Sequence, residues 1–233
     1  MTKRKLSFSL ICGILGCLCL GGGDWLMMFG DVNYRGKLFW LTDGVANIAP
    51  WRNTLAMALS FPGIIFYGIA LFAIADFINN KREKKIYNTL ITFSLTPWLC
   101  LHLFYIMILY LFSWLNQNGY AEMSLTVSEA LYNHLSWIVF ISEIFMLPPF
   151  IYWFWLQFKK KTIFPKALAF TNILIIYAVL YIIKMLLPNS PFRIGFTNGL
   201  MSESMLIWFI IVFLTSRKYN KEVLGDGRKE TQI

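Results

Sequence analysis

The chain alternates between long apolar runs and short polar segments, and six of the apolar runs stand out. A helix needs about 20 apolar residues to cross about 30 Å of hydrocarbon, and each of these runs is long enough. The pattern therefore predicts an all-α integral membrane protein, a six-transmembrane-helix bundle that forms a single domain over residues 1–216. The expected spans are 6–29, 51–78, 87–115, 127–157, 167–187 and 197–216.

Two features modify this simple bundle. The third and fourth runs are longer than a perpendicular crossing requires, so we expect them to tilt or to project from the membrane. Pro148 and Pro149 should kink the fourth run, because proline removes a backbone donor and clashes with the preceding turn. The 30–50 loop carries the apolar segment Leu38-Phe39-Trp40-Leu41. We expect this loop to lie in the membrane interface or to fold over the bundle as a lid.

Basic residues alternate between the two sets of loops and predict the orientation. Sixteen of the 21 Lys and Arg residues fall in one set, at the N-terminus, after the second and fourth runs, and after the sixth run. The other set holds only four, and Lys184 lies inside a span. By the positive-inside rule, both termini are then cytoplasmic, with residues 217–233 as a polar tail. The four basic residues on the opposite side are Arg35, Lys37, Arg52 and Arg193.

Composition supports a membrane protein and argues against a nucleic-acid partner. Hydrophobic residues make up 58% of the 233-residue chain and charged residues only 14%, too few to cover a soluble globule. The net charge of +9 comes from the short clusters between apolar runs, so we expect membrane lipids with anionic head groups as partners. We expect a multi-pass protein of the cell membrane, most simply a bacterial plasma membrane.

The four cysteines lie within expected spans and show no disulfide or zinc spacing. Ile14-Leu15-Gly16-Cys17 is similar to a lipoprotein cleavage box, although Leu15 is bulky where that motif has a small residue. The apolar run continues to Phe29, so we interpret this segment as the first membrane helix. Whether Cys17 is lipidated stays open.

Several ionisable side chains fall inside the apolar runs, where a charge costs about 2.5–3.5 kcal/mol on insertion scales. Most of them lie in the outer half of the expected spans, which predicts a polar pocket that opens outward. Local spacing adds two pairs that share a helix face, His102 with Tyr105 and Asn198 with Ser202. The ionisable residues are Asp24, Asp76, His102, Glu129, His134, Glu143, Lys184 and Glu203.

We assign candidate roles within such a pocket. Histidine and carboxylate side chains suit general acid–base chemistry, so the candidate proton carriers are His102, His134 and Glu203. The candidate ligand-binding residues are Asp24, Arg52, Tyr105, Glu129, Lys184 and Asn198. Two structural alternatives remain open: Asp24 could form an ion pair with Arg52, and Lys184 could pair with Glu203 or extend to the membrane surface.

Three functions fit this sequence. The first is binding or chemical modification of a lipophilic small molecule in an outward-facing pocket. The second is transport of protons or cations along Asp24, His102, Glu143 and Asp76, and the third is a non-catalytic scaffold or sensor subunit. No ligand spacing indicates a metal site, no motif names a cofactor, and the oligomeric state and any enzymatic activity stay open.

Short motifs add a resemblance. Gly23-Asp24-Trp25-Leu26 ends the first run, and Pro50-Trp51-Arg52 opens the second. Together with Pro165 and the region of Asn172, they resemble a family of small bacterial multi-span membrane proteins that is known only as a domain of unknown function. The resemblance points to Asp24 and Arg52 as positions of interest and implies no activity.

Overall fold

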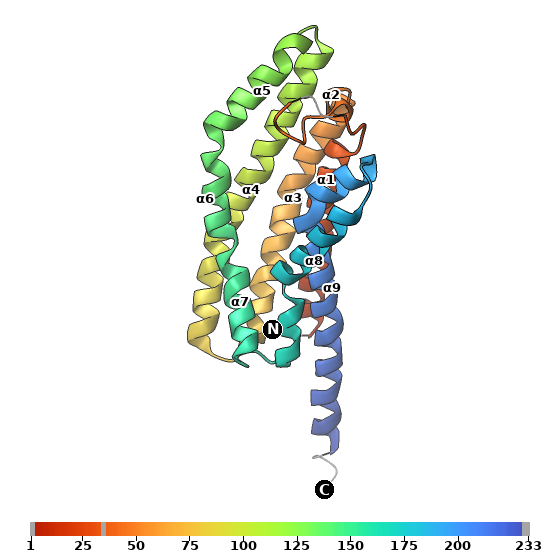
Figure 1. Cartoon of the computed structure of the whole chain (residues 1–233). Helices are drawn as coiled ribbons and strands as arrows, with labels where there is room; N and C mark the ends of the chain where they lie inside the picture. Colours follow the sequence, from red (N-terminus) through yellow and green to blue (C-terminus); the bar gives the residue numbers. More distant parts are fainter. Residues whose placement is uncertain (1–2, 34–35, 230–233) are drawn as a thin grey trace.

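The protein is built from helices that run antiparallel to one another along one axis (Figure 1). The computed structural model describes residues 3–33 and 36–229, and within these residues it contains no β-strand, only an isolated bridge between Ile78 and Thr162. Arg35 therefore lies outside the described residues. The helices are α1 (Lys3–Met28), α2 (Asp43–Ala46), α3 (Pro50–Ile74), η1 (Ala75–Phe77), α4 (Lys81–Gln117), α5 (Ala121–Leu135), α6 (Trp137–Met146), α7 (Pro148–Phe158), η2 (Lys166–Thr171), α8 (Ile173–Leu186) and α9 (Pro191–Lys229).

Within residues 3–33 and 36–229, five helical segments are long and apolar enough to cross a membrane. Large apolar side chains point outward from them, such as Phe61, Phe140 and Ile144, which are 50%, 66% and 65% exposed. Apolar surface of this extent is stable in lipid and costly in water. The chain is therefore a multi-pass membrane protein. The five segments are Arg4–Met28, Pro50–Phe77, Lys81–Gln117, Trp137–Phe158 and Pro191–Arg217.

The expected count of six spanning helices is not confirmed. The expected span 167–187 is divided into the 3₁₀ helix η2 and the shorter α8, which has 14 residues. At 1.5 Å per residue, α8 covers only about 21 Å, less than the hydrocarbon thickness. Asn172 makes this break, because its side chain caps Leu174 N at 3.0 Å and also donates to the carbonyl of Phe150 in α7 at 3.0 Å.

The expected fourth span is also divided. Its first part is the separate helix α5, and the chain bends at Ser136 before α6 begins. A second break falls at Leu147, directly before the two prolines, where a kink is expected. The structure therefore has an α4–α5 hairpin that extends beyond the ends of α1 and α3, as Figure 1 shows.

Both α1 and α9 have their chain-terminal parts at the same end of the molecule in Figure 1. The cytoplasmic orientation of that end stays a prediction. The polar tail expected over 217–233 stays a prediction; within it α9 continues as a helix to Lys229, and 230–233 lie outside the described residues. Extending an existing helix adds a hydrogen bond for each residue without a new nucleation step, so a polar sequence can continue it.

Glycines in α1 and α3 allow α1, α3 and α9 to pack closely together. A Cβ on Gly16 would lie 2.6 Å from Cδ1 of Tyr67 and 2.9 Å from the carbonyl oxygen of Gly63 in α3. A Cβ on Gly13 would lie 2.7 Å from Ala70 of α3 and from the Phe209 ring of α9. Small residues that allow such backbone approach are typical of helix packing in membranes.

Two hydrophobic clusters fill the bundle, one at each end. The lower cluster, at the end with η1 and α7, contains Tyr67, Trp153 and Phe209. The upper cluster, at the end with α2, contains Trp40 and Phe112. The segment after α1 folds back over the upper cluster, because Trp40 is only 4% exposed and packs among helices. Of the two expectations for this loop, the lid is therefore the one that the structure bears out.

Candidate functional site

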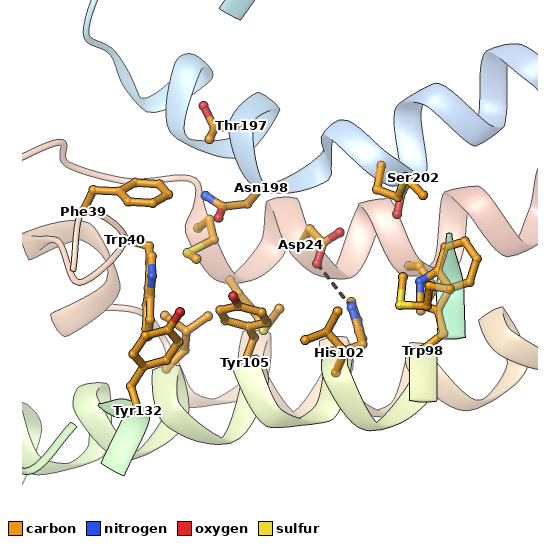
Figure 2. Close-up of a pocket in the computed structure, with 17 residues that line it drawn as sticks. Asp24, Phe39, Trp40, Trp98, His102, Tyr105, Tyr132, Thr197, Asn198 and Ser202 are labelled. Atoms are coloured by element: carbon orange, nitrogen blue, oxygen red, sulfur yellow. Dashed lines mark ion pairs between the residues drawn. The ribbon is translucent and has the colours of Figure 1, made fainter. Parts of the chain in front are cut away.

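A pocket lies between the two hydrophobic clusters, bounded by α1, α4 and α9 and closed at one end by the loop before α2. Its volume is about 300 Å³, at the lower end of typical ligand pockets of about 300–1,000 Å³. Figure 2 shows the side chains that point into it. They are Leu20, Asp24, Met27, Met28, Phe39, Trp40, Trp98, Leu101, His102, Tyr105, Leu109, Tyr132, Met146, Thr197, Asn198, Met201 and Ser202.

One face of α4 forms the floor of the pocket. Trp98, His102, Tyr105 and Leu109 follow one another at intervals of four, three and four residues, which places them on one side of a helix. In Figure 2 the three labelled residues of this face form a row, with Trp98 near one end of the pocket and His102 and Tyr105 nearer the middle. The regular helix through this region therefore fixes the order of polar and apolar groups along the pocket.

Asp24 and His102 meet in the middle of the pocket. The Nδ1 atom of His102 lies 3.5 Å from Oδ1 of Asp24, with side chains 11% and 16% exposed respectively. This contact is longer than a hydrogen bond of about 2.7–3.2 Å, so His102 satisfies the carboxylate only in part. The Ser202 side chain of α9 is a further neighbour of Asp24.

The second nitrogen of His102 has no partner among the described residues. Nε2 is buried and makes no hydrogen bond. A carboxylate at Nδ1 normally holds a neutral imidazole with its proton on that side, which leaves Nε2 as an acceptor. Leaving such a buried group unsatisfied costs about 1–3 kcal/mol. The pocket thus contains a polar atom that a bound molecule could satisfy.

Aromatic rings close the end of the pocket farthest from Trp98. Trp40 packs edge-on against Tyr105 and Tyr132, with ring centroids 5.7 and 5.4 Å apart. Phe39 lies beside Trp40 at the same end (Figure 2). Trp40 belongs to the loop and Tyr132 to α5. The pocket is therefore closed at this end only while the loop packs against α5.

Two polar side chains, Glu129 and Gln117, hold the segment between α1 and α3, which forms the lid of the pocket. The carboxylate of Glu129 in α5 accepts a hydrogen bond from the backbone N–H of Lys37 at 2.6 Å. The amide of Gln117 at the end of α4 donates to the carbonyls of Ala46 and Ile48, at 3.0 and 2.7 Å. The loop is therefore held from both arms of the α4–α5 hairpin.

The chemistry available is that of an oriented imidazole beside a carboxylate. Asp24 can orient His102, whose Nε2 can accept a hydrogen bond or a proton from a molecule in the pocket. The apolar walls contribute four methionines, whose flexible side chains adapt to irregular ligands. Such a pocket can bind an amphiphilic molecule by its body and hold one polar group at Asp24 and His102.

The structure brings together four of the candidate residues from the sequence, namely Asp24, His102, Tyr105 and Asn198. Both expected face-sharing pairs line the pocket, because Tyr105 accompanies His102 and Ser202 accompanies Asn198. These residues come from α1, α4 and α9, so their convergence depends on how the three helices pack.

Glu203 lies outside the pocket although it follows Ser202 directly. Consecutive residues point about 100° apart on a helix, so when Ser202 faces the pocket Glu203 faces away from it. Its Oε1 accepts a hydrogen bond from the Trp25 indole at 2.9 Å, and its Oε2 is buried without a partner among the described residues. Glu203 lines a separate groove of about 290 Å³ between α1 and α9.

Arg52 is placed at the end of α1, not in the pocket. Its Nη2 donates to the carbonyl of Phe29 at 2.9 Å and lies 3.5 Å from that of Trp25. The carboxylate of Asp24 is instead paired with His102, so the alternative of an Asp24–Arg52 ion pair is wrong. Arg52 positions α1 and acts on the pocket only through that helix.

The three remaining candidates also lie away from the pocket. His134 is exposed on α5, and Glu129 holds the loop. The Nζ of Lys184 lies 4.5 Å from the centre of the Tyr181 ring on the same helix, so it does not pair with Glu203. In each case the direction of the side chain, towards the loop for Glu129 and away from the pocket for the other two, cannot be read from depth along a span.

Sequence reasoning missed some pocket residues because they are apolar or aromatic residues that are common in any membrane helix. Trp98, Tyr132 and Met201 have the composition of any membrane helix. For Trp98, the available signal was its position four residues before His102. Trp40 was singled out only as part of an apolar loop. The lining could have been predicted more fully by including the aromatic residues that share a helix face with His102.

The described part of the chain contains no metal cluster, and it offers no continuous polar path from Asp24 to Asp76. No group of three or more His, Cys, Asp or Glu residues there could hold a metal ion. Asp76 is paired with Lys84, and one hydrophobic cluster extends from Trp98 at the pocket to Phe77 beside Asp76. This packing gives the expected proton route no support.

Comparison with known proteins identifies a family but no activity. No curated protein and no solved structure matches the chain. The model of a family of unknown function, DUF6796, matches residues 1–219, which include every residue of the pocket. The chain therefore belongs to the family of unknown function DUF6796.

Proposed function

We propose that this membrane protein binds a lipophilic small molecule in the pocket between α1, α4 and α9. The observation that carries the proposal is the Asp24–His102 pair, whose Nε2 is buried without a partner inside a cavity of about 300 Å³. A polar group of the ligand would occupy this position, and its apolar body would contact the methionine and aromatic walls.

The lid supports this proposal because it makes the pocket a defined space. Trp40 closes one end, while Glu129 and Gln117 hold the loop backbone in place. Ligand pockets are typically concave and mostly apolar with a few placed polar groups, and this pocket has that character. We further propose that this end of the bundle faces outward, as the distribution of basic residues indicates.

The test is recovery of small molecules from the purified protein by native and denaturing mass spectrometry. We expect a stoichiometric ligand in the wild type and binding weaker by about two- to tenfold in His102→Ala, since a hydrogen bond to a neutral ligand contributes about 0.5–1.5 kcal/mol. His134→Ala is the matched control, because His134 is exposed outside the pocket.

A second variant tests the space itself. Met201→Trp places a larger side chain in the lining, so it should exclude the ligand while leaving Asp24 and His102 intact. Equal ligand recovery from the wild type, His102→Ala and Met201→Trp would refute the proposal, as would a wild type that carries no ligand from any membrane source.

A further inference from the structure

We infer that the ligand of this pocket carries a cationic head group that donates N–H hydrogen bonds, such as a protonated amine on a lipophilic body. The inference rests on the proposed function and goes further by assigning the charge and the donor character of the ligand. It follows from the polar atoms that the pocket leaves free, from the charges around it, and from its aromatic walls.

Several polar groups of the pocket offer acceptors, while the hydroxyl of Tyr105 can either donate or accept. The amide nitrogen of Asn198 donates to the carbonyl of Ile194 at 2.8 Å, which leaves its oxygen available. The hydroxyl of Thr197 donates to the carbonyl of Arg193 at 2.6 Å. With the Asp24 carboxylate and Nε2 of His102, these groups form a set that a donor-rich ligand matches.

The charges around the pocket are negative. Neither lysine nor arginine occurs among the lining residues within the described part of the chain, whereas Asp24 lies in the centre. A second carboxylate lies close by on α9: Glu203 accepts a hydrogen bond from the indole of Trp25, the residue next to Asp24. A negative charge in an apolar environment is stable only with a positive or donating partner, and an anionic ligand would be repelled.

None of the described lysines and arginines lines the pocket, and Lys37, in the loop two residues before Phe39, is exposed. The guanidinium of Arg52 donates to the last carbonyls of α1, and Lys184 lies over Tyr181. Arg193 donates to the carbonyl of Leu187 at 3.3 Å, at the end of α8. Among the described residues, Asp24 therefore has the long contact from the His102 imidazole and the neighbouring Ser202 hydroxyl, and neither a neutral imidazole nor a hydroxyl cancels its negative charge.

Aromatic rings complete the match to a cation. Trp40, Tyr105 and Tyr132 gather at the lid end, and Trp98 lies at the other end. Cations bind aromatic faces at about 6 Å or less, with more energy when they are removed from water. An ammonium head group bound beside Asp24 would also lie close to the aromatic rings that line the same pocket.

The experiment compares three probes of equal chain length: n-decylamine, decan-1-ol and decanoate. Binding to the wild type in nanodiscs of zwitterionic lipid would be measured at pH 7.5 by tryptophan quenching, with Met201→Trp as the filled-pocket reference. We expect the amine to bind at least about tenfold more tightly than the alcohol, because a charged hydrogen bond is roughly twice as strong as a neutral one and Asp24 adds attraction. Decanoate should bind most weakly.

Two charge-removing variants locate the effect. Asp24→Asn should remove the preference for the amine, whereas Glu122→Gln should keep it, because Glu122 is exposed on α5 outside the pocket. Equal affinity of amine and alcohol in the wild type would overturn the inference, and so would a preference that survives Asp24→Asn. If the alcohol binds as tightly as the amine and Met201→Trp abolishes the binding of both, the proposed function holds and the inference about charge fails. If no probe distinguishes Met201→Trp from the wild type, both fail.

Discussion

Arg52 holds the end of α1 in place, and its removal should loosen the helix that carries Asp24. In the structure, its Nη2 donates to the carbonyl of Phe29 at 2.9 Å and approaches that of Trp25 at 3.5 Å. The Trp25 carbonyl already accepts from the N–H of Phe29 at 3.0 Å. Arg52→Gln therefore removes one good charged hydrogen bond and one weak contact.

The magnitude follows from these contacts. A hydrogen bond from a charged donor contributes about 1.5–3 kcal/mol, and a cation at a helix C-terminus about 0.3–1 kcal/mol. Arg52 is partly exposed, so solvent screening reduces the sum. We expect Arg52→Gln to lower the free energy of unfolding by about 1–2 kcal/mol. Arg52→Lys should lose less, since it keeps the charge but not the planar fork.

The assay is equilibrium unfolding in mixed dodecyl maltoside and SDS micelles, followed by far-UV circular dichroism. Lys37→Gln is the control, because it removes a cation from an exposed side chain in the loop after α1. If Arg52→Gln loses no more stability than Lys37→Gln, the contact to α1 is not what this residue contributes. A loss in both that disappears at high salt would point to general electrostatics.

Three further predictions test packing and orientation. Gly16→Val should destabilise the bundle by about 1–3 kcal/mol in the same assay, because the new side chain meets the carbonyl of Gly63 at 2.9 Å; a neutral effect would contradict the close approach of α1 and α3. Glu83→Gln should lower thermal stability, and the difference should shrink at high salt, since its carboxylate accepts hydrogen bonds from Tyr152 and Lys161; a difference independent of salt would count against the ion pair. Single cysteines at positions 119 and 160, in a cysteine-free chain, should react with a membrane-impermeant maleimide from the outside and the inside of cells respectively, and the reverse pattern would refute the expected orientation.

Part of the candidate site could be predicted because its residues share helix faces. His102 with Tyr105 and Asn198 with Ser202 follow from spacing along one helix, and all four line the pocket. Glu203 shows the limit, because its depth along α9 is similar to that of Ser202 while its direction is not. Depth can be counted along a sequence, but the rotation of a helix about its axis is set by its neighbours.

The division of the expected 167–187 span also depended on distant contacts. Hydropathy alone favours one continuous helix there, yet Asn172 turns its side chain to the carbonyl of Phe150 and to the start of α8. The break is stable because these polar groups satisfy one another, and the partner on α7 cannot be identified from the local pattern.

The sequence by itself determined that this protein is helical and lies in a membrane, because hydrophobicity along a run and hydrogen bonding within a helix are local properties. It also placed Asp24 and His102 inside apolar runs, and both lie within helices long enough to cross a membrane. Only the tertiary structure decided that Asp24 meets His102, that Trp40 closes the space above them, and that Glu203 and Arg52 serve other contacts. The physical reason is that these outcomes depend on how three helices rotate and pack, which glycine contacts and a folded-back loop fix together.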